Sequence, residues 1–484
     1  IGILNLNGGV YATRQITKTN GTGIVNFNGG ILKALTSSGS FLTGLTSANV
    51  FSGGLTVDTN GQSITIGQAL LAPAGNGVTT IAVTNGGSGY VGAPYVSISG
   101  TGAGATAVAN MVDDGMGNGT FKIGSITITS AGTGYTGTPA VTLTGGGGTG
   151  AVLDTAVLAA NTSGGVTRTG SGTLTLSGTN SYTGATVVNA GGTLVAGSTS
   201  AFGSNSATTV DGTLRLAGRN NALGSLAGSS TGIVENASAT SATLTVGGDN
   251  SSQSYSGIVR DGSGGGALNF IKVGSGTQIL SGNSTYTGTT TVSQGALQIG
   301  AAGLGSTAAS SAVSVNGASA TLAGSGMVGG AVTVTSGFIQ PGDTGGTSVG
   351  TLSVGSLNLT SGGTAVFQIE GVSLNDRIFV LNSGGLTLDG KVSVTTSLTG
   401  TDFSTAFAAG CKYDLLDWSG VVSGTFDAGT LVRNGSQDNS LQFDLPDLSS
   451  LSLYWDVSSF LSSSSPPTAP APAWGHTSRP STPG

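Results

Sequence analysis

Very few side chains in this sequence can perform acid–base or nucleophilic chemistry. Charged residues make up only 7% of the 484 residues, and the chain has one histidine and one cysteine. His476 lies in a Ser/Pro/Ala-rich segment that we expect to be disordered, so the sequence predicts neither a histidine-based catalytic triad nor a zinc site. Cys411 cannot form an intramolecular disulfide or a cysteine-based metal site, and a single cysteine is most often a small core residue.

Asp113 and Asp114 are the first pair of carboxylates that could act on a polysaccharide, because glycosidases use two carboxyl groups across the scissile bond. They begin the stretch DDGMGNG at 113–119. Asp before glycine is typical of turns, and we expect an exposed loop or hairpin tip. With Asn118 the pair offers oxygen ligands for calcium, but the spacing is not that of an EF-hand or a nonapeptide repeat.

Two further acidic candidates lie in the last quarter of the chain. Asp376 and Arg377 are neighbours, so their side chains would point to opposite faces of a strand. Asp414 and Asp417 lie three residues apart, and we expect them to be solvated. The sequence therefore predicts no catalytic, cofactor-binding or metal-binding residue and a non-enzymatic protein. A polysaccharide-degrading enzyme that uses Asp113, Asp376 or Asp414 is the alternative.

Two low-complexity patterns have weaker functional interpretations. The run GGGGTG at 145–150 lacks the GK[ST] of a phosphate-binding loop, so we expect a flexible corner. Thr-x-Thr pairs form ice-binding faces in some β-helical antifreeze proteins, and such pairs occur here, for example at 127–129, 142–144, 173–175, 243–245 and 333–335. They do not recur at a fixed period, so ice binding is the less favoured alternative.

The composition indicates strands joined by tight turns. Glycine contributes 89 residues, and 37% of the residues are hydrophobic. Thr and Val are typical of strands and Gly and Ser of turns, whereas Glu, Lys and Arg, which favour long helices, are scarce. With 14 Lys plus Arg and a net charge of −6, no basic patch suits a phosphate backbone, so we expect no nucleic-acid partner.

Repeats are the strongest signal in the sequence. ILNLNGGV at 3–10 returns as IVNFNGGI at 24–31, which is a period of 21 residues. The alternation of apolar and polar residues before Gly-Gly predicts a half-buried strand and a turn. A period near 20 residues matches one β-helix coil, and stacked coils would place Asn5 above Asn26 in a ladder of amides.

A second repeat has a period of 45 residues. TIAVTNGGSGYVGAPYVSISG at 80–100 matches SITITSAGTGYTGTPAVTLTG at 125–145. Each copy predicts a strand, a Gly-x-Gly-Tyr turn and a second strand, and we expect Tyr90 and Tyr135 to cap small hydrophobic clusters. We interpret residues 78–155 as an inserted two-unit Gly-Tyr β module.

A third repeat carries a recognisable motif. GSGTLTLSGTNSYTGATVVNAGGTLVAG at 170–197 returns at 274–300; the two copies align without a gap from Gly170/Gly274 to Gly191/Gly295, and Tyr182 and Tyr286 occupy equivalent places. The first copy closely resembles the autotransporter-associated β-strand repeat, also called the passenger-associated transport repeat, whereas the second departs from that pattern at Gln278 and Ala296. The resemblance implies a right-handed parallel β-helix that is exposed on, or released from, a Gram-negative-type cell.

We therefore predict an all-β protein, a right-handed parallel β-helix (solenoid) with an inserted β module and a C-terminal β cap. Five segments are expected: N-terminal coils at 1–77, the module at 78–155, the coils with the two repeats at 156–365, the last coils and cap at 366–461, and a disordered tail at 462–484.

The expected role is that of a passenger or stalk in adhesion, biofilm matrix or surface display. Its partners would be surface glycans, other cells or matrix components, bound by the module or by aromatic residues of the cap around Tyr413 and Trp418. The resemblance also implies an outer-membrane translocator, which this sequence does not contain. Because Ile1 falls in the middle of a repeat, a fragment is expected. Because the segment around His476 does not resemble the family, a frameshifted or truncated C-terminal end is also expected.

Overall fold

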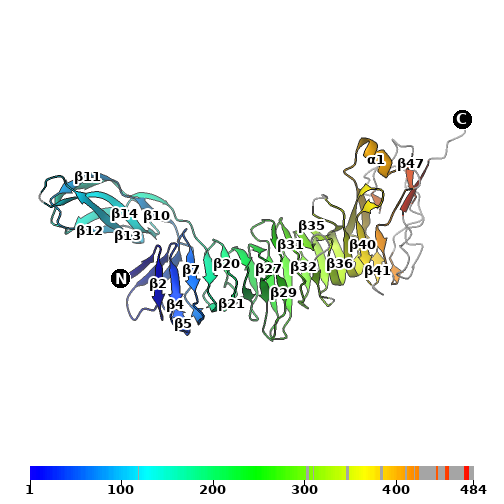
Figure 1. The fold of residues 1–484 in the computed structure, drawn as a ribbon, viewed down its shortest axis with the longest axis horizontal. Coiled ribbons are helices and arrows are strands. Elements are labelled where there is room, and N and C mark those ends of the chain that lie inside the picture. Colours follow the sequence, from blue (N-terminus) through cyan, green and yellow to red (C-terminus); the bar gives the residue numbers. More distant parts are fainter. Residues whose placement is uncertain are drawn as a thin grey trace. The chain divides into compact units, whose positions relative to one another are not determined.

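The computed structural model describes residues 1–117, 119–300, 305–308, 310–344, 348–381, 385–408, 411–418, 420–424, 443–444, 453–456 and 474–478. Strands dominate these residues, as Figure 1 shows. Residues 1–206 and 207–484 form two compact units.

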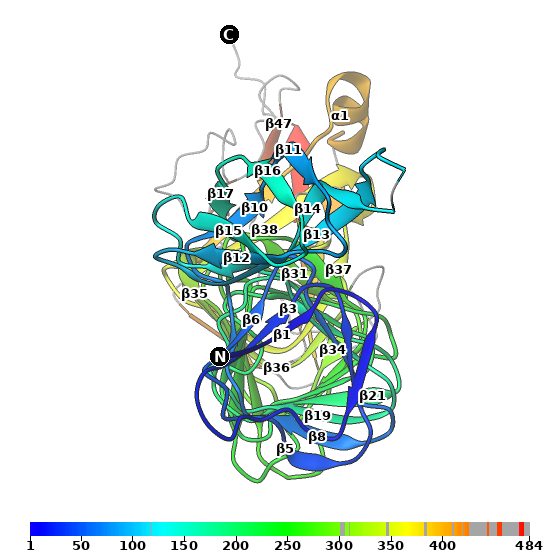
Figure 2. The same cartoon turned by 90° about the vertical axis from the view of Figure 1, so that its left-hand side faces the viewer.

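Three columns of parallel strands form the solenoid of the first unit (Figure 1, Figure 2). The first column contains β1 (Gly2–Leu6), β3 (Gly23–Phe27), β6 (Ser47–Val50) and β9 (Leu70–Leu71). The second contains β2 (Val10–Thr13), β4 (Ile31–Ala34), β7 (Leu55–Asp58), β18 (Val166–Thr169) and β20 (Thr186–Val188). The third contains β5 (Ser38–Leu42), β8 (Ser63–Ile66), β19 (Gly172–Leu176) and β21 (Gly192–Ala196). Each turn of the chain thus lies on the previous one, which confirms the predicted parallel β-solenoid.

The core of the solenoid follows from the alternation along each strand. In β19 the side chains of Leu174 and Leu176 are fully buried, whereas Thr173 and Thr175, which alternate with them, are only half-buried. Leu174 stacks between Ile64 of β8 and Leu194 of β21. Burial of such a side chain contributes about 1.5–3 kcal/mol, so every coil gains stability from the coils beside it.

The predicted asparagine ladder is present. Asn5 pairs with Asn26 across β1 and β3, and Asn26 donates its amide to the Asn5 Oδ1 at 2.9 Å. Asn49 of β6 adds a further rung and donates to the Asn26 Oδ1 at 2.9 Å. The sequence around Asn49 does not repeat the ILNLNGG pattern, so this rung was not predicted.

An antiparallel module interrupts the first unit between β9 and β18. Its strands are β10 (Asn76–Thr80), β11 (Val83–Ser88), β12 (Tyr95–Ser99), β13 (Ala103–Asp113), β14 (Phe121–Thr133), β15 (Ala140–Thr144), β16 (Thr149–Leu153) and β17 (Val157–Ala160). β10 pairs with β17, β11 pairs with β16, and the other four form a sheet in the order β14-β13-β12-β15. Because Val57 pairs directly with Arg168, the solenoid resumes where the module left it.

Two small cores hold the module together, and each contains one of the two repeat tyrosines. Tyr135 packs with Val78 and Ile81, whereas Tyr90 packs with Val96 and Ile123. The expectation that both tyrosines close hydrophobic clusters is confirmed.

The second unit continues with parallel pairing over most of its length. Its strands are β22 (Ala207–Val210), β23 (Thr213–Arg215), β24 (Asn221–Leu223), β25 (Ser225–Ala227), β26 (Ile233–Glu235), β27 (Ala242–Val246), β28 (Gln253–Tyr255), β29 (Ile258–Arg260), β30 (Leu268–Lys272), β31 (Thr277–Leu280), β32 (Thr290–Val292), β33 (Gly295–Ile299), β34 (Ser306–Thr307), β35 (Val313–Gly324), β36 (Met327–Pro341), β37 (Thr351–Leu359), β38 (Gly363–Gly371), β39 (Leu374–Asn375), β40 (Arg377–Val380), β41 (Leu386–Leu388), β42 (Lys391–Thr395), β44 (Leu416–Asp417), β45 (Val422–Ser423) and β46 (Phe443–Asp444). Among these, β38 and β39 form an antiparallel hairpin.

The end of the second unit differs from the expected disordered tail. β43 (Lys412–Tyr413), β47 (Leu453–Asp456) and β48 (Trp474–Ser478) form an antiparallel sheet in which Trp455 pairs with His476. The expected tail at 462–484 thus contains one strand, at 474–478, that pairs with two distant strands, and its disorder elsewhere stays a prediction. The rest of 462–484 lies outside the described residues. Helix α1 (Gly400–Ala406) has seven residues, and no helix in the described part of the chain is long and apolar enough to span a membrane.

Candidate functional site

Asp113 and Asp114 stabilise the turn between β13 and β14. Asp113 Oδ1 accepts a hydrogen bond from the Gly115 amide at 2.7 Å, and Asp114 Oδ1 accepts one from the Met116 amide at 3.0 Å. The hydroxyl of Thr120 also donates to Asp114 and is the main reason that the pKa of this carboxyl is lowered. The turn prediction is confirmed, whereas Asn118 lies outside the described residues.

Asp376 is fully buried and contacts the backbone. Its Oδ1 accepts from the Gly350 amide at 2.8 Å, and its Oδ2 accepts from the Gln368 amide at 2.9 Å. Burial raises the pKa of this carboxyl to about 7. Arg377 lies on the other side of the strand, as expected, so Asp376 has no open path to a substrate.

Arg377, Asp414 and Asp417 form an ion cluster that corrects the expectation of solvated carboxylates. The Arg377 Nη1 lies 3.0 Å from the Asp417 Oδ2 and 3.6 Å from the Asp414 Oδ2. Asp417 is only 9% exposed, because β44 pairs with β40 and so brings it to the neighbouring rung. Burial, followed by the charge of Asp417, raises the pKa of Asp414. The Arg377 guanidinium thus forms ion pairs with both carboxylates.

A second ion cluster, which the sequence did not reveal, crosses three coils of the second unit. Arg215, Glu235 and Arg260 occupy paired positions on β23, β26 and β29. Glu235 is 2% exposed, and each arginine lies 2.7 Å from one of its oxygens. Burial alone would raise the pKa of Glu235, but the hydrogen bonds and charges of the two arginines outweigh it and lower the pKa.

Two buried cations lie in the solenoid core where aliphatic residues would be expected. Arg168 donates to the Gly172 carbonyl at 2.8 Å, and a Cβ at position 192 would overlap its guanidinium, which explains the glycine there. Lys272 donates to the carbonyls of Val273 and Gly274 at 2.6 and 2.8 Å. Burial lowers the pKa of Lys272 to about 8. Both cations donate to backbone carbonyl groups at turns of the chain, and both side chains are buried.

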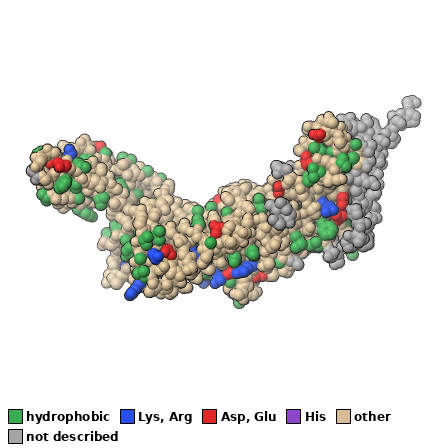
Figure 3. Space-filling model, in the orientation of Figure 1, with side chains coloured by type: hydrophobic (Ala, Val, Ile, Leu, Met, Phe, Trp, Pro, Cys, Tyr) green, Lys and Arg blue, Asp and Glu red, His purple; other side chains and the backbone are tan. Residues whose placement is uncertain are grey.

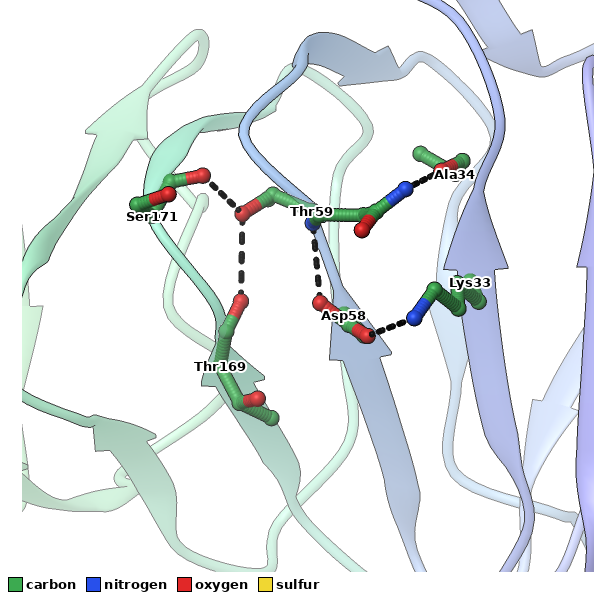
Figure 4. A network of polar contacts seen from close by, with 7 residues as sticks. Lys33, Ala34, Asp58, Thr59, Thr169 and Ser171 are labelled. Atoms are coloured by element: carbon green, nitrogen blue, oxygen red, sulfur yellow. Dashed lines mark hydrogen bonds and ion pairs between the residues drawn. The ribbon is translucent and has the colours of Figure 1, made fainter.

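Polar side chains also join the coils that flank the module, as Figure 4 shows. The Thr59 hydroxyl lies 3.1 Å from the Thr169 carbonyl and 2.9 Å from the Ser171 carbonyl. Lys33 and Asp58 form an ion pair of 3.3 Å on neighbouring strands. The Thr59 contacts join the chain after the module to the chain before it, whereas the Lys33–Asp58 pair joins two coils that both precede the module.

In each of the two repeats, the tyrosine side chain is buried and forms a hydrogen bond with a threonine of the same repeat. The Tyr182 hydroxyl lies 2.8 Å from the Thr186 hydroxyl, and the Tyr286 hydroxyl lies 2.7 Å from the Thr290 hydroxyl. Both tyrosines are fully buried, and burial raises the pKa of each. The Tyr-Thr-Gly motif therefore serves packing and not surface chemistry.

The exposed face of the module sheet offers an accessible aromatic surface. Thr127, Val108, Tyr95 and Thr144 form one row across β14, β13, β12 and β15. Tyr95 is 71% exposed and Val108 48% exposed. Asn110 lies on the same face and donates to the Thr127 hydroxyl at 2.7 Å. Figure 3 shows how few charged side chains the visible surface carries.

Tyr413 and Trp418, the cap residues expected to bind a ligand, offer no such face. Tyr413 is fully buried, and Trp418 is 6% exposed. Tyr413 packs against Phe407 with ring centroids 5.7 Å apart. Among the described residues of the two ligand-binding regions expected from the sequence, the exposed aromatic side chains therefore lie in the module.

Comparison with known families matches the passenger-associated-transport-repeat model to residues 166–196 and 270–299. The chain is a β-solenoid protein with passenger-associated transport repeats, the type found in autotransporter passengers. In each match the first two strands stack on the last two, with Val166 paired to Thr186 and Phe270 to Thr290. A repeat is thus a self-stacking pair of coils, and the recognition made from the sequence is confirmed. No curated protein matches the chain.

Proposed function

We propose that this passenger is a non-enzymatic, exported stalk on the surface of a Gram-negative-type cell. Its solenoid holds the antiparallel module, and the module adheres to a neutral polysaccharide. The assignment to the autotransporter-passenger type supports export and display. Adhesion through the module is our inference from its exposed sheet face.

The row around Tyr95 carries this proposal. A sugar ring has an apolar face of C–H groups and a rim of hydroxyls, so it suits an exposed aromatic ring flanked by hydrogen-bonding side chains. Tyr95 supplies the ring, and Thr127, Thr144 and Asn110 supply hydroxyls and an amide. No charged residue belongs to the row, so an acidic glycan gains nothing from it.

The positions of the acidic residues support a non-enzymatic role. Asp113 and Asp114 bind amides of their own turn, Asp376 is enclosed by the backbone, and Asp414 shares Arg377 with Asp417. Glycoside cleavage needs two carboxyl groups that both face the same bound sugar. These carboxyl groups are engaged in holding turns and strands.

Binding of the full chain to insoluble neutral polysaccharides, such as cellulose, starch and chitin, tests the proposal. Tyr95→Ala should lower the affinity about tenfold, since a lost stacking contact is worth roughly 1.4 kcal/mol. Tyr11→Ala is the matched control, because Tyr11 is also exposed, at 40%, but lies on the solenoid. Equal binding of both variants and the parent would contradict the role of the sheet face.

The same samples test the enzymatic alternative. The supernatants should contain no released sugar for the parent protein or for the Asp113→Ala, Asp376→Ala and Asp414→Ala variants. Sugar released by the parent and lost in one of these variants would replace our proposal with a polysaccharide-degrading enzyme.

A further inference from the structure

A crevice of about 170 Å³ lies in the first unit, where the module meets the asparagine ladder. Its solenoid side carries Asn7, Asn26 and Asn28, which belong to the first two coils, together with Phe51. Its module side carries Ser130 of β14 and Asn161, which follows β17. Residues far apart in the sequence therefore meet around one hollow.

Several amide groups at the crevice are held by the protein, so their orientation is fixed. Asn26 is 2% exposed and donates to the Asn5 Oδ1 at 2.9 Å and to the Ser130 hydroxyl at 3.1 Å. Asn161 donates to the Gly132 carbonyl at 2.9 Å. Asn28 accepts from the Gly53 amide through its Oδ1 at 2.8 Å.

These same contacts leave other polar atoms available to a ligand. Among the described residues, the Nδ2 of Asn28 and the Oδ1 of Asn161 make no hydrogen bond, and neither do the hydroxyls of Ser52 and Thr162 on the crevice lining. They include an amide donor, an amide acceptor and two groups that can do both. Asn28, Ser52 and Thr162 are exposed and Asn161 is half-buried, so a ligand would replace the hydrogen bonds that these groups make to water.

The remaining lining is uncharged and, apart from Thr79, apolar. Phe51 is 6% exposed, and Ala131, Ala159 and Ala160 lie around it. No Asp, Glu, Lys, Arg or His lines the crevice, so nothing there would compensate a charged ligand. An apolar wall with an uncharged ring of donors and acceptors matches a neutral ligand that has one hydrocarbon face and several hydroxyls.

We propose that this crevice binds one neutral pyranose ring, as a free sugar or as the terminal residue of a glycan. The volume is below the roughly 300 Å³ at which pockets for drug-sized ligands begin, which suits a single ring and not an oligosaccharide chain. This site shares no residue with the row around Tyr95, and it does not depend on the proposed adhesion by the sheet face.

Ligand-detected NMR on the full chain, with saturation transferred from protein to sugar, tests the site. The probes are the methyl glycosides of glucose, galactose, mannose and N-acetylglucosamine, with glucuronate as the charged comparison. We expect at least one neutral glycoside to bind and glucuronate not to bind.

Two variants locate the binding. Ala160→Tyr fills the crevice from an exposed position and should abolish binding, whereas Ala140→Tyr, at an exposed alanine on β15, should leave it unchanged. Asn28→Asp keeps the oxygen that accepts from Gly53 but removes the free Nδ2 donor, and it should weaken binding about tenfold.

The outcomes separate this proposal from the adhesive function. If no glycoside binds, or if Ala160→Tyr binds as well as the parent, the crevice holds only water and the proposal is overturned. Glycoside binding that survives in Tyr95→Ala and is lost in Ala160→Tyr supports the crevice. This result holds whether or not the sheet face retains polysaccharide.

Discussion

Replacing Glu235 by glutamine should destabilise the second unit measurably. The carboxylate is buried and lies 2.7 Å from both Arg215 and Arg260. Glutamine keeps the shape of the side chain but removes its charge. The positive charges of Arg215 and Arg260 then lie on the two strands beside a neutral residue. Breaking a buried ion pair costs about 3–5 kcal/mol. Because the arginine side chains are 39% and 41% exposed, solvent screens part of this cost, and we expect roughly 2–3 kcal/mol.

The contribution of Glu235 to stability should change with pH, and the shift of its pKa gives the direction of that change. The pKa of Glu235 is lower in the folded protein than its ordinary value of 4.5. The unfolded chain therefore binds more protons as the solution becomes acidic, and the stability that the carboxylate contributes is present above about pH 4.5. It is lost as the pH falls through the folded pKa. The difference in the free energy of unfolding between the parent and Glu235→Gln should therefore be largest at pH 7 and fall toward zero in acid.

Urea unfolding followed by circular dichroism at pH 7 and at about pH 3 measures both effects. Hydrogen exchange of β23, β26 and β29 shows whether the loss is local, as expected when coils contact only their neighbours. Lys33→Met is the matched control, because the Lys33–Asp58 pair is more exposed and should be worth at most about 1 kcal/mol. If Glu235→Gln costs no more than Lys33→Met at pH 7, or costs the same at both pH values, the reasoning is refuted.

Two further predictions concern buried polar groups in the repeats. Tyr286→Phe removes the hydroxyl that faces Thr290 at 2.7 Å and should lower the free energy of unfolding by about 1–3 kcal/mol; an unchanged urea midpoint would show that this hydrogen bond contributes nothing. For Lys272, burial lowers the pKa from 10.5 to about 8, so the unfolded chain binds more protons between these values and the stability of the parent should rise with pH across that window. Lys272→Met should abolish this rise in a urea series from pH 7.5 to about 10.5, and a rise of the same size in the variant would contradict the assignment.

Side chains whose role depends on pairing between distant strands escaped the sequence analysis. Asp414 and Asp417 were expected in solvent, yet both lie beside Arg377, because β44 forms the rung after β40. Nothing local reveals that register, since β41, β42, α1 and β43 separate the two strands in sequence. The strand around His476 was missed for the same reason, because its partners lie more than 15 residues away.

The sequence by itself determined the structure of the individual solenoid coils. Period-two alternation and a repeat near 20 residues specify which side chains face inward and which residues stack, so the asparagine ladder, the repeat tyrosine clusters and the solenoid all followed from local pattern. Only the tertiary structure decided which surfaces are available. It buried Tyr413, left Tyr95 at 71% exposure, and formed a crevice between the first three coils and the module. Exposure and enclosure depend on contacts between segments far apart in sequence, and no local pattern encodes them.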